Sequence, residues 1–306
     1  MPAAQVQGQS ARAPSTGELL SGVAQAMADN AARIQTLMAQ GRIRHQKYFR
    51  DVEAPHVTLD AELWLTYQAP KFRLHLQYAP TGPGGDAPAA RATLEQQTVL
   101  FDGQTVTTVE QRPDGEWRGD IYFEFHKQNM LRMAGFPFAD PVTLWNEPLP
   151  VGRADLLASK TTPLLGGGFV GVLDKDTYRL KYYFLGDFPF DLRRVSSYRA
   201  DEELPFRDWH LQWRQAHGIH YVERLVRRVN ESPPADGDLS ASGVSHEQID
   251  LQFPKVVLNP AISPAACELS ALALPEETPF YDHRVNINGK PKLLRWRGGQ
   301  LVPHTP

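Results

Sequence analysis

Long stretches of the chain alternate between apolar and polar residues with a period of two. In the segment 71–79, for example, Phe72, Leu74 and Leu76 alternate with polar residues. Successive side chains of a β-strand point to opposite faces of a sheet, so this period predicts strands with one apolar face. The segments that we expect to form strands are 42–52, 57–68, 71–79, 93–101, 104–111, 177–185, 191–200, 207–215, 219–229 and 246–258.

Two-residue turns join several of these segments. Asp102-Gly103 and His217-Gly218 each separate two strand-like runs, and Asn288-Gly289 lies inside a last predicted hairpin. Such pairs tolerate the positive φ angles that fit the twist of antiparallel strands. We therefore predict antiparallel hairpins at all three places.

Helical spacing occurs in few places. Apolar residues recur at intervals of three and four from Thr16 to Gly41, with Ser15 or Thr16 as an N-cap and Gly41 as a stop, so we expect one amphipathic helix there. The segment 119–149 breaks the period of two and is predicted to contain short helices, and 152–162 a further helix.

The composition supports a β-rich globular protein. The chain has 306 residues, 42% of them hydrophobic and 22% charged, and its 25 prolines and 23 glycines suit many short strands. A net charge of -3 gives no basic field for nucleic acid, which we do not expect as a partner. The single cysteine, Cys267, excludes an intramolecular disulfide. No run approaches the ~18 apolar residues of a membrane helix.

The first residues of the chain leave its location open. Residues 1–16 are rich in Ala, Gln, Ser and Pro, and we expect them to be a disordered leader. They contain no apolar core of a signal peptide, which by itself indicates the cytosol. The same composition is typical of the tether that remains when an export signal has been trimmed, so the residues alone support both interpretations.

None of the candidate chemical motifs indicates an enzyme. Gly166 to Gly171 matches the pattern GxGxxG, but we expect a helix before it and a strand after it, the reverse of the dinucleotide-binding order, so a loop is favoured. His210, His217 and His220 lie in one hairpin without zinc-site spacing and are interpreted as surface histidines. We expect neither a metal ion nor a cofactor.

Two further motifs receive similar interpretations. Cys267 is flanked by small apolar residues, without the cations that would lower a thiol pKa, so we expect a buried, inert thiol. Asp174 and Asp176 lack the additional oxygens of a calcium loop and are interpreted as a solvated turn.

The segment from Phe123 to Trp145 is the most apolar interruption of the strand pattern. Its Met and Phe residues suit either a packed core or the adaptable lining of an apolar cavity. The strands offer a second apolar surface, for example at Trp64 and at Tyr182 with Phe184. If the two surfaces meet, the sheet either closes tightly on its helices or leaves a cavity, and the residues leave both alternatives open.

Three motifs follow the first predicted helix in a recognisable order. They are the strand pair AELWLTYQAPKFRLHL, the hairpin TVLFDGQTVTTV and the segment CELSALALPEETPFYDHR. The residues that carry the pattern are Leu63, Trp64, Leu65, Pro70, Phe72, Arg73, Asp102, Gly103, Thr105, Leu269, Leu272, Leu274, Pro275 and Asp282. In this order the motifs resemble the lipoprotein-localisation superfamily, the LolA/LolB-like carriers and their relatives, over about residues 17–284.

The resemblance implies an α+β fold. We expect an open, strongly curved antiparallel half-barrel sheet with helices covering its concave face and an apolar cavity between them. A single domain would span 17–284 with a helical insertion at about 120–165, and 285–306 would be a C-terminal hairpin extension and tail. The segment 258–284 would be the closing edge strand, whose proline limits further pairing.

The resemblance also implies a function, which is non-catalytic binding of lipid or lipoprotein acyl chains. The expected protein is a monomeric periplasmic or exported carrier, its signal or N-terminal lipid anchor removed, acting in outer-membrane lipoprotein or lipid transport. Its partners would be a lipid or acylated lipoprotein and an inner- or outer-membrane transport or signalling protein. The expected cavity lining is Trp64, Tyr67, Phe72, Leu74, Phe123, Met130, Met133, Phe136, Leu144, Trp145, Tyr182 and Phe184.

Two departures from the family pattern argue against the specific carrier cycle of the lipoprotein carriers. Tyr67 stands where the lipoprotein carriers have an arginine that helps to hold the lid, and the chain is much longer than those carriers. The alternative is a sensory or structural protein-interaction module of the same fold, with a filled core.

Overall fold

The computed structural model describes residues 16–49, 55–79, 94–134, 136, 157–165, 167–185, 192–199, 202–230 and 244–304. The helices are α1 (Thr16–Ala32) and α2 (Lys127–Met133), with the short helices η1 (Glu124–His126), η2 (Pro264–Cys267) and η3 (Leu269–Ala271). The strands are β1 (Thr36–Phe49), β2 (His56–Gln68), β3 (Lys71–Tyr78), β4 (Gln96–Phe101), β5 (Thr105–Gln111), β6 (Trp117–Phe123), β7 (Lys160–Pro163), β8 (Phe169–Asp174), β9 (Tyr178–Phe184), β10 (Leu192–Arg199), β11 (Arg207–Ala216), β12 (Ile219–Asn230), β13 (Val244–Leu258), β14 (Pro279–Ile287), β15 (Lys290–Arg297) and β16 (Gln300–Pro303).

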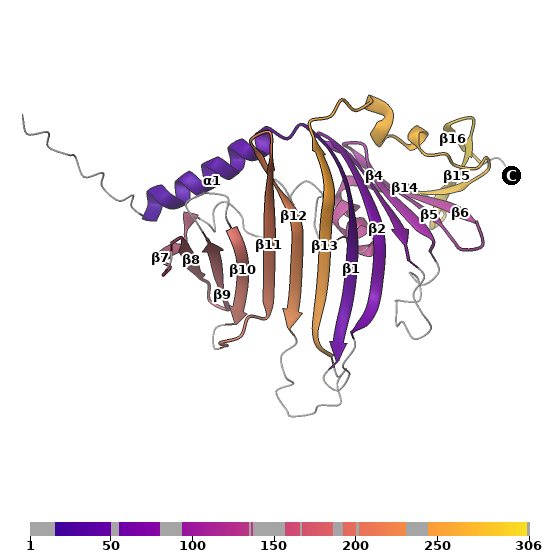
Figure 1. Ribbon diagram of the computed structural model, residues 1–306. Coiled ribbons are helices and arrows are strands. Elements are labelled where there is room, and N and C mark those ends of the chain that lie inside the picture. Colours follow the sequence, from indigo (N-terminus) through magenta and orange to yellow (C-terminus); the bar gives the residue numbers. More distant parts are fainter. Residues whose placement is uncertain are drawn as a thin grey trace, which may run out of the picture.

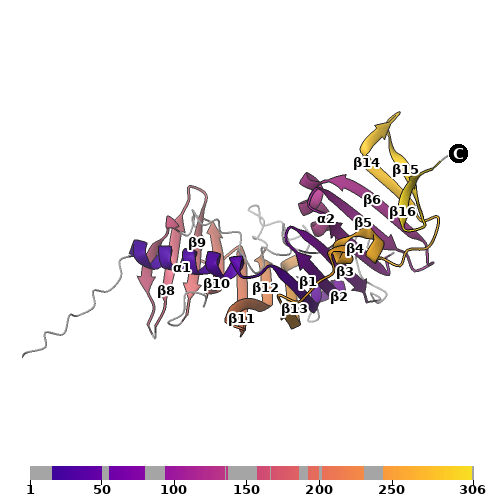
Figure 2. The same ribbon diagram turned by 90° about the horizontal axis from the view of Figure 1, so that it is seen from above.

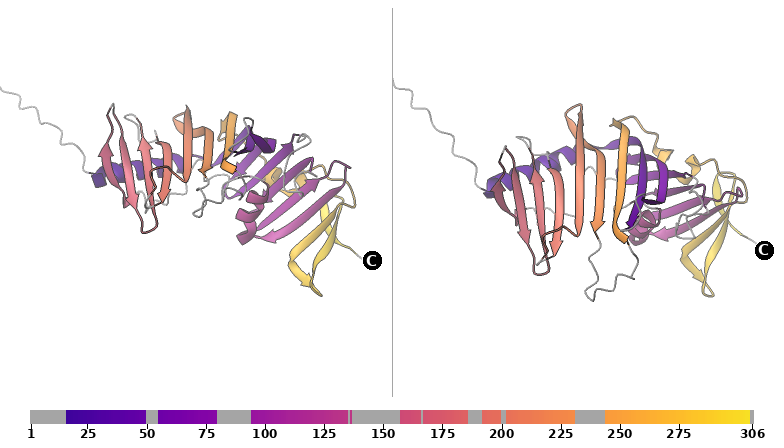
Figure 3. Two further views of the ribbon diagram at one scale, coloured as in Figure 1. Left: turned by 90° about the horizontal axis from the view of Figure 1, so that it is seen from below. Right: turned by 60° about the horizontal axis from the view of Figure 1, so that its bottom comes forward.

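All of these strands belong to one open sheet (Figure 1). The order is β16-β15-β14-β6-β5-β4-β3-β2-β1-β13-β12-β11-β10-β9-β8-β7, so β16 and β7 form the edges. The end formed by β14 to β16 turns out of the plane of the opposite end (Figure 2, Figure 3). The prediction of an open sheet built mainly of strands is confirmed, whereas a helical layer over its concave face stays a prediction.

The sheet has two faces of different character. Leu63, Leu65 and Leu74 point to one face, where they join a large buried cluster with Leu20 of α1 and Leu131 of α2. We call this the core face. The opposite face, which we call the outer face, carries the residues that alternate with them on the same strands.

The predicted hairpins are confirmed at all three places, with two-residue turns at His217-Gly218 and Asn288-Gly289 and a longer turn, 102–104, between β4 and β5. Gly103, Gly218 and Gly289 have φ angles of 101°, 72° and 81°, and His217 and Asn288 also have positive φ. These angles lie in the left-handed region, where glycine carries no steric penalty. Each pair therefore closes a hairpin between neighbouring antiparallel strands.

The first helix is shorter than predicted. It ends at Ala32, and the residues from Thr36 onward form β1, so the predicted helix as far as Gly41 was wrong. Gly41 lies inside β1, and a Cβ atom there would come within 2.0 Å of the backbone oxygen of Gln252 on β13. The glycine permits close approach of two strands, and the alternation of buried Leu37 with exposed Met38 follows the period of a strand.

The segment 258–284 differs from the predicted closing edge strand. After β13 the chain forms η2 and η3 and only then enters β14, which lies between β6 and β15, so that β16 is the edge. Prolines such as Pro264 and Pro275 lack the N–H group that a strand ladder needs, which favours this irregular path. The chain crosses from β13 to the far side of β6, and β6 and β14 are the parallel pair in a sheet whose other described pairs are antiparallel.

A second, smaller core holds the β14 end of the sheet together. Phe280, Leu294 and Trp296 pack with Val109 and Leu274 on the outer face. Gly119 on β6 makes room for this packing, because a Cβ atom there would lie 2.1 Å from the Phe280 ring. The last three strands are therefore part of the same continuous sheet.

The predicted helical insertion is described only at its ends. β6 continues to Phe123, η1 and α2 follow, and β7 begins at Lys160, so the helix predicted for 152–162 is wrong at its last three residues. Most of the segment between Met133 and Leu157 lies outside the described residues. None of the described helices is long and apolar enough to cross a membrane.

Candidate functional site

Much of the outer face consists of ion pairs between neighbouring strands. Arg42 and Arg44 of β1 contact Asp60 of β2, with N–O distances of 2.6 Å and 2.8 Å. Similar pairs join β10 to β11 at 2.8 Å and β12 to β13 at 2.5 Å. We call these residues the paired-charge region: Arg42, Arg44, Asp60, Arg194, Asp208, Arg224 and Asp250.

The carboxylates of the paired-charge region are held in their charged form. Burial favours the neutral acid at Asp208, but hydrogen bonds from His210, Arg194 and Ser196 together keep the pKa of Asp208 below its usual range. Burial acts in the same way at Asp60, where the two arginines keep the pKa low. These carboxylates and arginines therefore neutralise one another's charge.

The ion pairs give way to an apolar groove on the same face, which we call the Trp64 groove. It has a volume of about 490 Å³. Val257, Met38, Thr66 and Arg73 form one row across β13, β1, β2 and β3, because each is the register partner of the next. The complete lining is Met38, Ala39, Gln40, Trp64, Leu65, Thr66, Arg73, His75, Lys255, Val257 and Leu272.

The Trp64 groove presents apolar side chains to its surroundings. Met38 is 46% exposed and Val257 is 55% exposed. The Trp64 ring lies 5.4 Å from the His75 ring, centroid to centroid, and Leu272 contributes from the segment after η3. Exposed apolar side chains that adjoin one another in a concave surface are typical of ligand-binding grooves.

The charges in the Trp64 groove differ from those of the paired-charge region. Arg73 is half-buried and has no hydrogen bond or ion pair from its guanidinium within the described part of the chain. The Lys255 Nζ lies 3.4 Å from the neutral Oε1 of Gln40. Burial, together with the neighbouring Arg73, lowers the pKa of His75. The groove is thus an apolar surface with uncompensated positive charge.

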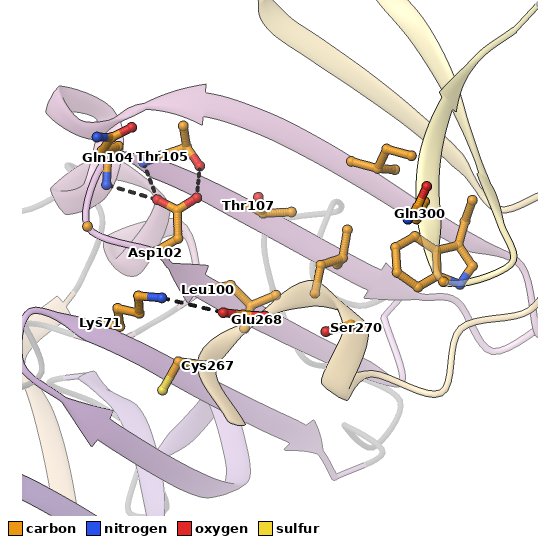
Figure 4. Close-up of a pocket in the computed structure, with 15 residues that line it drawn as sticks. Lys71, Leu100, Asp102, Gln104, Thr105, Thr107, Cys267, Glu268, Ser270 and Gln300 are labelled. Carbon is orange, nitrogen blue, oxygen red and sulfur yellow. Dashed lines mark hydrogen bonds and ion pairs between the residues drawn. The ribbon is translucent and has the colours of Figure 1, made fainter. Parts of the chain in front are cut away.

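A second, more polar groove lies beside it on the outer face (Figure 4). It has a volume of about 830 Å³. The Asp102 carboxylate at its rim accepts hydrogen bonds from the backbone N–H groups of Gln104 and Thr105, at 2.8 Å and 2.7 Å, and from the Thr105 hydroxyl. The Lys71 Nζ lies 3.5 Å from Glu268. Asp102 therefore stabilises the turn between β4 and β5. Lys71 is paired with the Glu268 carboxylate.

The two grooves are separated by the segment that begins at η2. Cys267 and Glu268 line the polar groove, while Leu272 lines the Trp64 groove. The Cys267 thiol is buried and lies 3.7 Å from the backbone oxygen of Thr66, and burial raises its pKa. The predicted burial of this thiol is confirmed, and a raised pKa leaves it mainly uncharged at neutral pH.

The structure distributes the predicted cavity-lining residues over both faces. Trp64 points to the outer face, whereas Phe72 points to the core face, because Trp64 pairs with His75 and Phe72 with Tyr67. A single cavity on one face does not contain both. Among the predicted lining residues, those on the core face that are at most 1% exposed are Phe72, Leu74, Phe136, Tyr182 and Phe184.

The remaining predicted lining residues are scattered. Met130 is buried and Tyr67 packs partly buried against the same core, whereas Phe123 and Met133 are exposed. Leu144 and Trp145 lie outside the described residues. The lining of a cavity on the core face therefore stays a prediction.

His210, His217 and His220, interpreted from the sequence as surface histidines, lie on the hairpin of β11 and β12, and within the described ranges no group of three His, Cys, Asp or Glu side chains could hold an ion. The ring of His210 lies 3.0 Å from Asp208. His217 is at the turn, with a φ of 51°. The interpretation as separate histidines of a hairpin is consistent with these positions.

Sequence reasoning missed Met38 and Val257 as groove residues. It also missed that the Arg73 guanidinium has no partner among the described residues. Met38 was assigned to the first helix, and Arg73 was noted only as part of a motif. The available signal was a local loss of alternation, because Leu63-Trp64-Leu65 and the Val-Val pair before Leu258 are apolar on both faces of their strands.

No family model and no curated protein matches the chain. Solved structures do match. A DUF1329 family protein from Desulfovibrio piger is 12% identical, with 85% of this chain and 100% of that chain covered and a TM-score of 0.44. A putative outer membrane lipoprotein-sorting protein domain from Vibrio parahaemolyticus is 10% identical, with 84% and 99% covered and a TM-score of 0.40.

A lipoprotein-sorting domain, the kind of protein that the sequence motifs resemble, is therefore among the matched structures. Both TM-scores are below 0.5, so the assignment of a function depends on the residues of this chain.

Proposed function

We propose that this protein binds a lipid or the acyl chains of a lipoprotein without catalysis, as a periplasmic carrier in outer-membrane lipoprotein or lipid transport. The proposal depends on the Trp64 groove, which is apolar, has a volume of about 490 Å³ and contains the exposed side chains of Met38 and Val257. An acyl chain in this groove would gain about 0.8 kcal/mol for each CH₂ group removed from water.

The dimensions of the groove support a chain-like ligand. The row from Val257 to Arg73 crosses four neighbouring strands, which corresponds to about 14 Å at the usual spacing of strands in a sheet. A flexible thioether such as that of Met38 adapts to hydrocarbon chains of different shape. An extended acyl chain fits this elongated surface better than a compact polar metabolite does.

The alternative function, a protein-interaction module with a filled core, has one observation in its favour. Phe72, Phe136 and Tyr182 on the core face are fully buried. Side chains packed to this degree are typical of a protein interior, where a ligand would have to displace existing contacts. In this alternative the exposed side chains of the Trp64 groove would contact a protein.

The first experiment is native mass spectrometry of the protein purified from its host, followed by organic extraction and lipid analysis. A co-purifying lipid or acylated peptide supports the carrier function. A mass equal to that of the bare chain, together with no uptake of a fluorescent fatty acyl probe, contradicts it and favours the protein-interaction module.

A pair of variants then locates the ligand. Trp64→Glu places a charge in the groove on the outer face, and Met133→Glu makes the same kind of change at an exposed position of α2. We expect Trp64→Glu to weaken probe binding at least about tenfold, because a carboxylate in an apolar site loses solvation. Met133→Glu should leave binding unchanged. If Met133→Glu weakened binding and Trp64→Glu did not, the ligand would lie on the core face.

A further inference from the structure

We propose that Arg73 binds the anionic head group, a phosphate or a carboxylate, of the lipid whose chain lies in the Trp64 groove. The inference rests on the proposed function, and it adds the chemical class of the ligand and its orientation. The head group would sit at β3, and the hydrocarbon would run across β2 and β1 toward Val257 on β13.

Arg73 lines the Trp64 groove from β3. It lies at one end of the row that crosses the groove, beside Thr66 on β2 and Leu100 on β4. The opposite end of the row consists of Met38 and Val257. This row is therefore cationic at its β3 end and apolar at its β13 end, which is the arrangement that an amphiphile requires. The second cation of the groove, Lys255, lies on β13 in the neighbouring row, opposite Gln40.

The Arg73 guanidinium has no acceptor among the described residues. A guanidinium carries five N–H donors, and a half-buried one loses part of its hydration. Within the described ranges no carboxylate or carbonyl accepts a hydrogen bond from Arg73, whereas Arg42, Arg194 and Arg224 on the same face each have an aspartate. A bound anion would supply the acceptor that Arg73 lacks.

The described lining of the groove carries positive charge. Its lining within the described residues includes Arg73 and Lys255 and no Asp or Glu. The nearby cation Lys71, two residues along β3, already pairs with Glu268 in the polar groove. A negative head group would thus meet no like charge among the groove's lining side chains.

The two cations of the groove differ in how well they suit an anionic head group. Lys255 is exposed and its ammonium lies 3.4 Å from Gln40, so it remains hydrated. The planar guanidinium of Arg73 can form two parallel hydrogen bonds with a phosphate or carboxylate. Arg73 should therefore contribute most of the head-group selectivity, and Lys255 serves as a matched control within the same groove.

The test compares four ligands below their critical micelle concentrations, by displacement of a fluorescent acyl probe from the full chain. Dodecyl phosphate is the anionic amphiphile, dodecyl phosphocholine the zwitterionic one and dodecyl maltoside the neutral one, while inorganic phosphate represents the head group alone. We expect dodecyl phosphate to bind at least about tenfold more tightly than the neutral amphiphile, because charge-assisted hydrogen bonds are the strong ones.

The variants assign this preference to one residue. Arg73→Gln should remove the preference and leave the affinity for dodecyl maltoside within twofold of the wild-type value. Lys255→Gln should keep most of the preference. Circular dichroism and the unfolding midpoint of Arg73→Gln should match those of the wild type, since no described residue loses a hydrogen bond or ion pair with the guanidinium.

Each outcome has a distinct meaning. If dodecyl maltoside binds but dodecyl phosphate is not preferred, or if Arg73→Gln keeps the preference, the head-group inference fails and the proposed function stands. Displacement of the probe by inorganic phosphate at concentrations similar to those of dodecyl phosphate also overturns the inference, because the site would then recognise a free anion. If the wild type binds none of the amphiphiles, the proposed function itself fails.

Discussion

The paired-charge region and the Trp64 groove share one face of one sheet, yet they use arginine differently. In the paired-charge region each arginine has an aspartate on a neighbouring strand, as in Arg224 with Asp250. In the groove Arg73 lies near Trp64 and Met38, and no described residue forms such an ion pair with it. The difference indicates which charges hold strands together and which are available to a ligand.

The largest expected effect comes from removal of a shared aspartate. Asp208 accepts hydrogen bonds from Arg194, His210 and the fully buried Ser196, so Asp208→Ala leaves several donors without an acceptor. We expect a loss of about 3 kcal/mol in the free energy of unfolding, measured by chemical denaturation. The matched change Asp174→Ala removes an exposed ion pair and should cost about 0.5 kcal/mol or less. Equal losses in the two variants would contradict the expectation that a buried aspartate contributes more to stability than an exposed one.

The paired-charge region should also make the protein sensitive to acid. The pKa values of Asp60 and Asp208 are lowered in the folded state, so the unfolded chain binds protons more readily around and below pH 4. The stability that these groups contribute is present above their unfolded pKa and is lost as the pH falls through the folded pKa. We expect a loss of about 2 kcal/mol between pH 5 and pH 2.

The contribution of one aspartate to the acid effect can be isolated. Asp208→Asn removes one of the titrating groups and keeps a side chain of similar shape. The variant should be less stable than the wild type at pH 7, and the gap should narrow at pH 2. A gap that is the same at both pH values would show that Asp208 does not titrate in this range.

Local elements of the fold were predictable because their signals are short-range. The three hairpin turns follow from the residue pairs that tolerate positive φ, such as Asn288-Gly289. The pairing of β1 with β13 and of β6 with β14 joins residues far apart in sequence, and the alternating pattern alone does not say which strands are neighbours. The path of the segment after Leu258 depends on those pairings, which is why its expected edge position was wrong.

The Trp64 groove was only partly predictable for a related reason. Trp64 was recognised as a candidate for ligand binding, but Leu63 and Leu65 beside it are also apolar, so the period of two does not assign a face to it. Only the register with Gln40 and His75 places it on the outer face. No described carboxylate pairs with Arg73, and this can be recognised only when the positions of several neighbouring strands are known.

An arginine on the core face provides a further contrast. Arg227 lies with its guanidinium 5.1 Å from the Trp209 ring centroid, and its buried Nε has no hydrogen-bond partner among the described residues. Burial and the neighbouring Arg207 lower the pKa of Arg227. Arg227→Met keeps an apolar side chain of similar length and removes the desolvated charge, so we expect a gain of about 1 kcal/mol in the free energy of unfolding.

The control for this variant lies three residues away on the same strand. Arg224 points to the outer face and pairs with Asp250, so Arg224→Met should lower the free energy of unfolding by about 1 kcal/mol. Thermal or chemical denaturation of the two variants should therefore give changes of opposite sign. Destabilisation by both would mean that Arg227 makes a favourable contribution on the core face.

The smallest expected change in stability tests the comparison most directly. Arg42→Gln removes one of two arginines from Asp60, and the Arg42 side chain is mostly exposed, so a loss of about 0.5 kcal/mol is expected because Arg44 still neutralises the carboxylate. Its effect on the affinity for dodecyl phosphate should stay within twofold, since solvent and salt screen exposed charges beyond about 8 Å. Arg73→Gln should do the opposite, with stability unchanged and affinity reduced about tenfold. If Arg42→Gln lowered the affinity as much as Arg73→Gln, the preference for anions would belong to the general field of the outer face and not to Arg73.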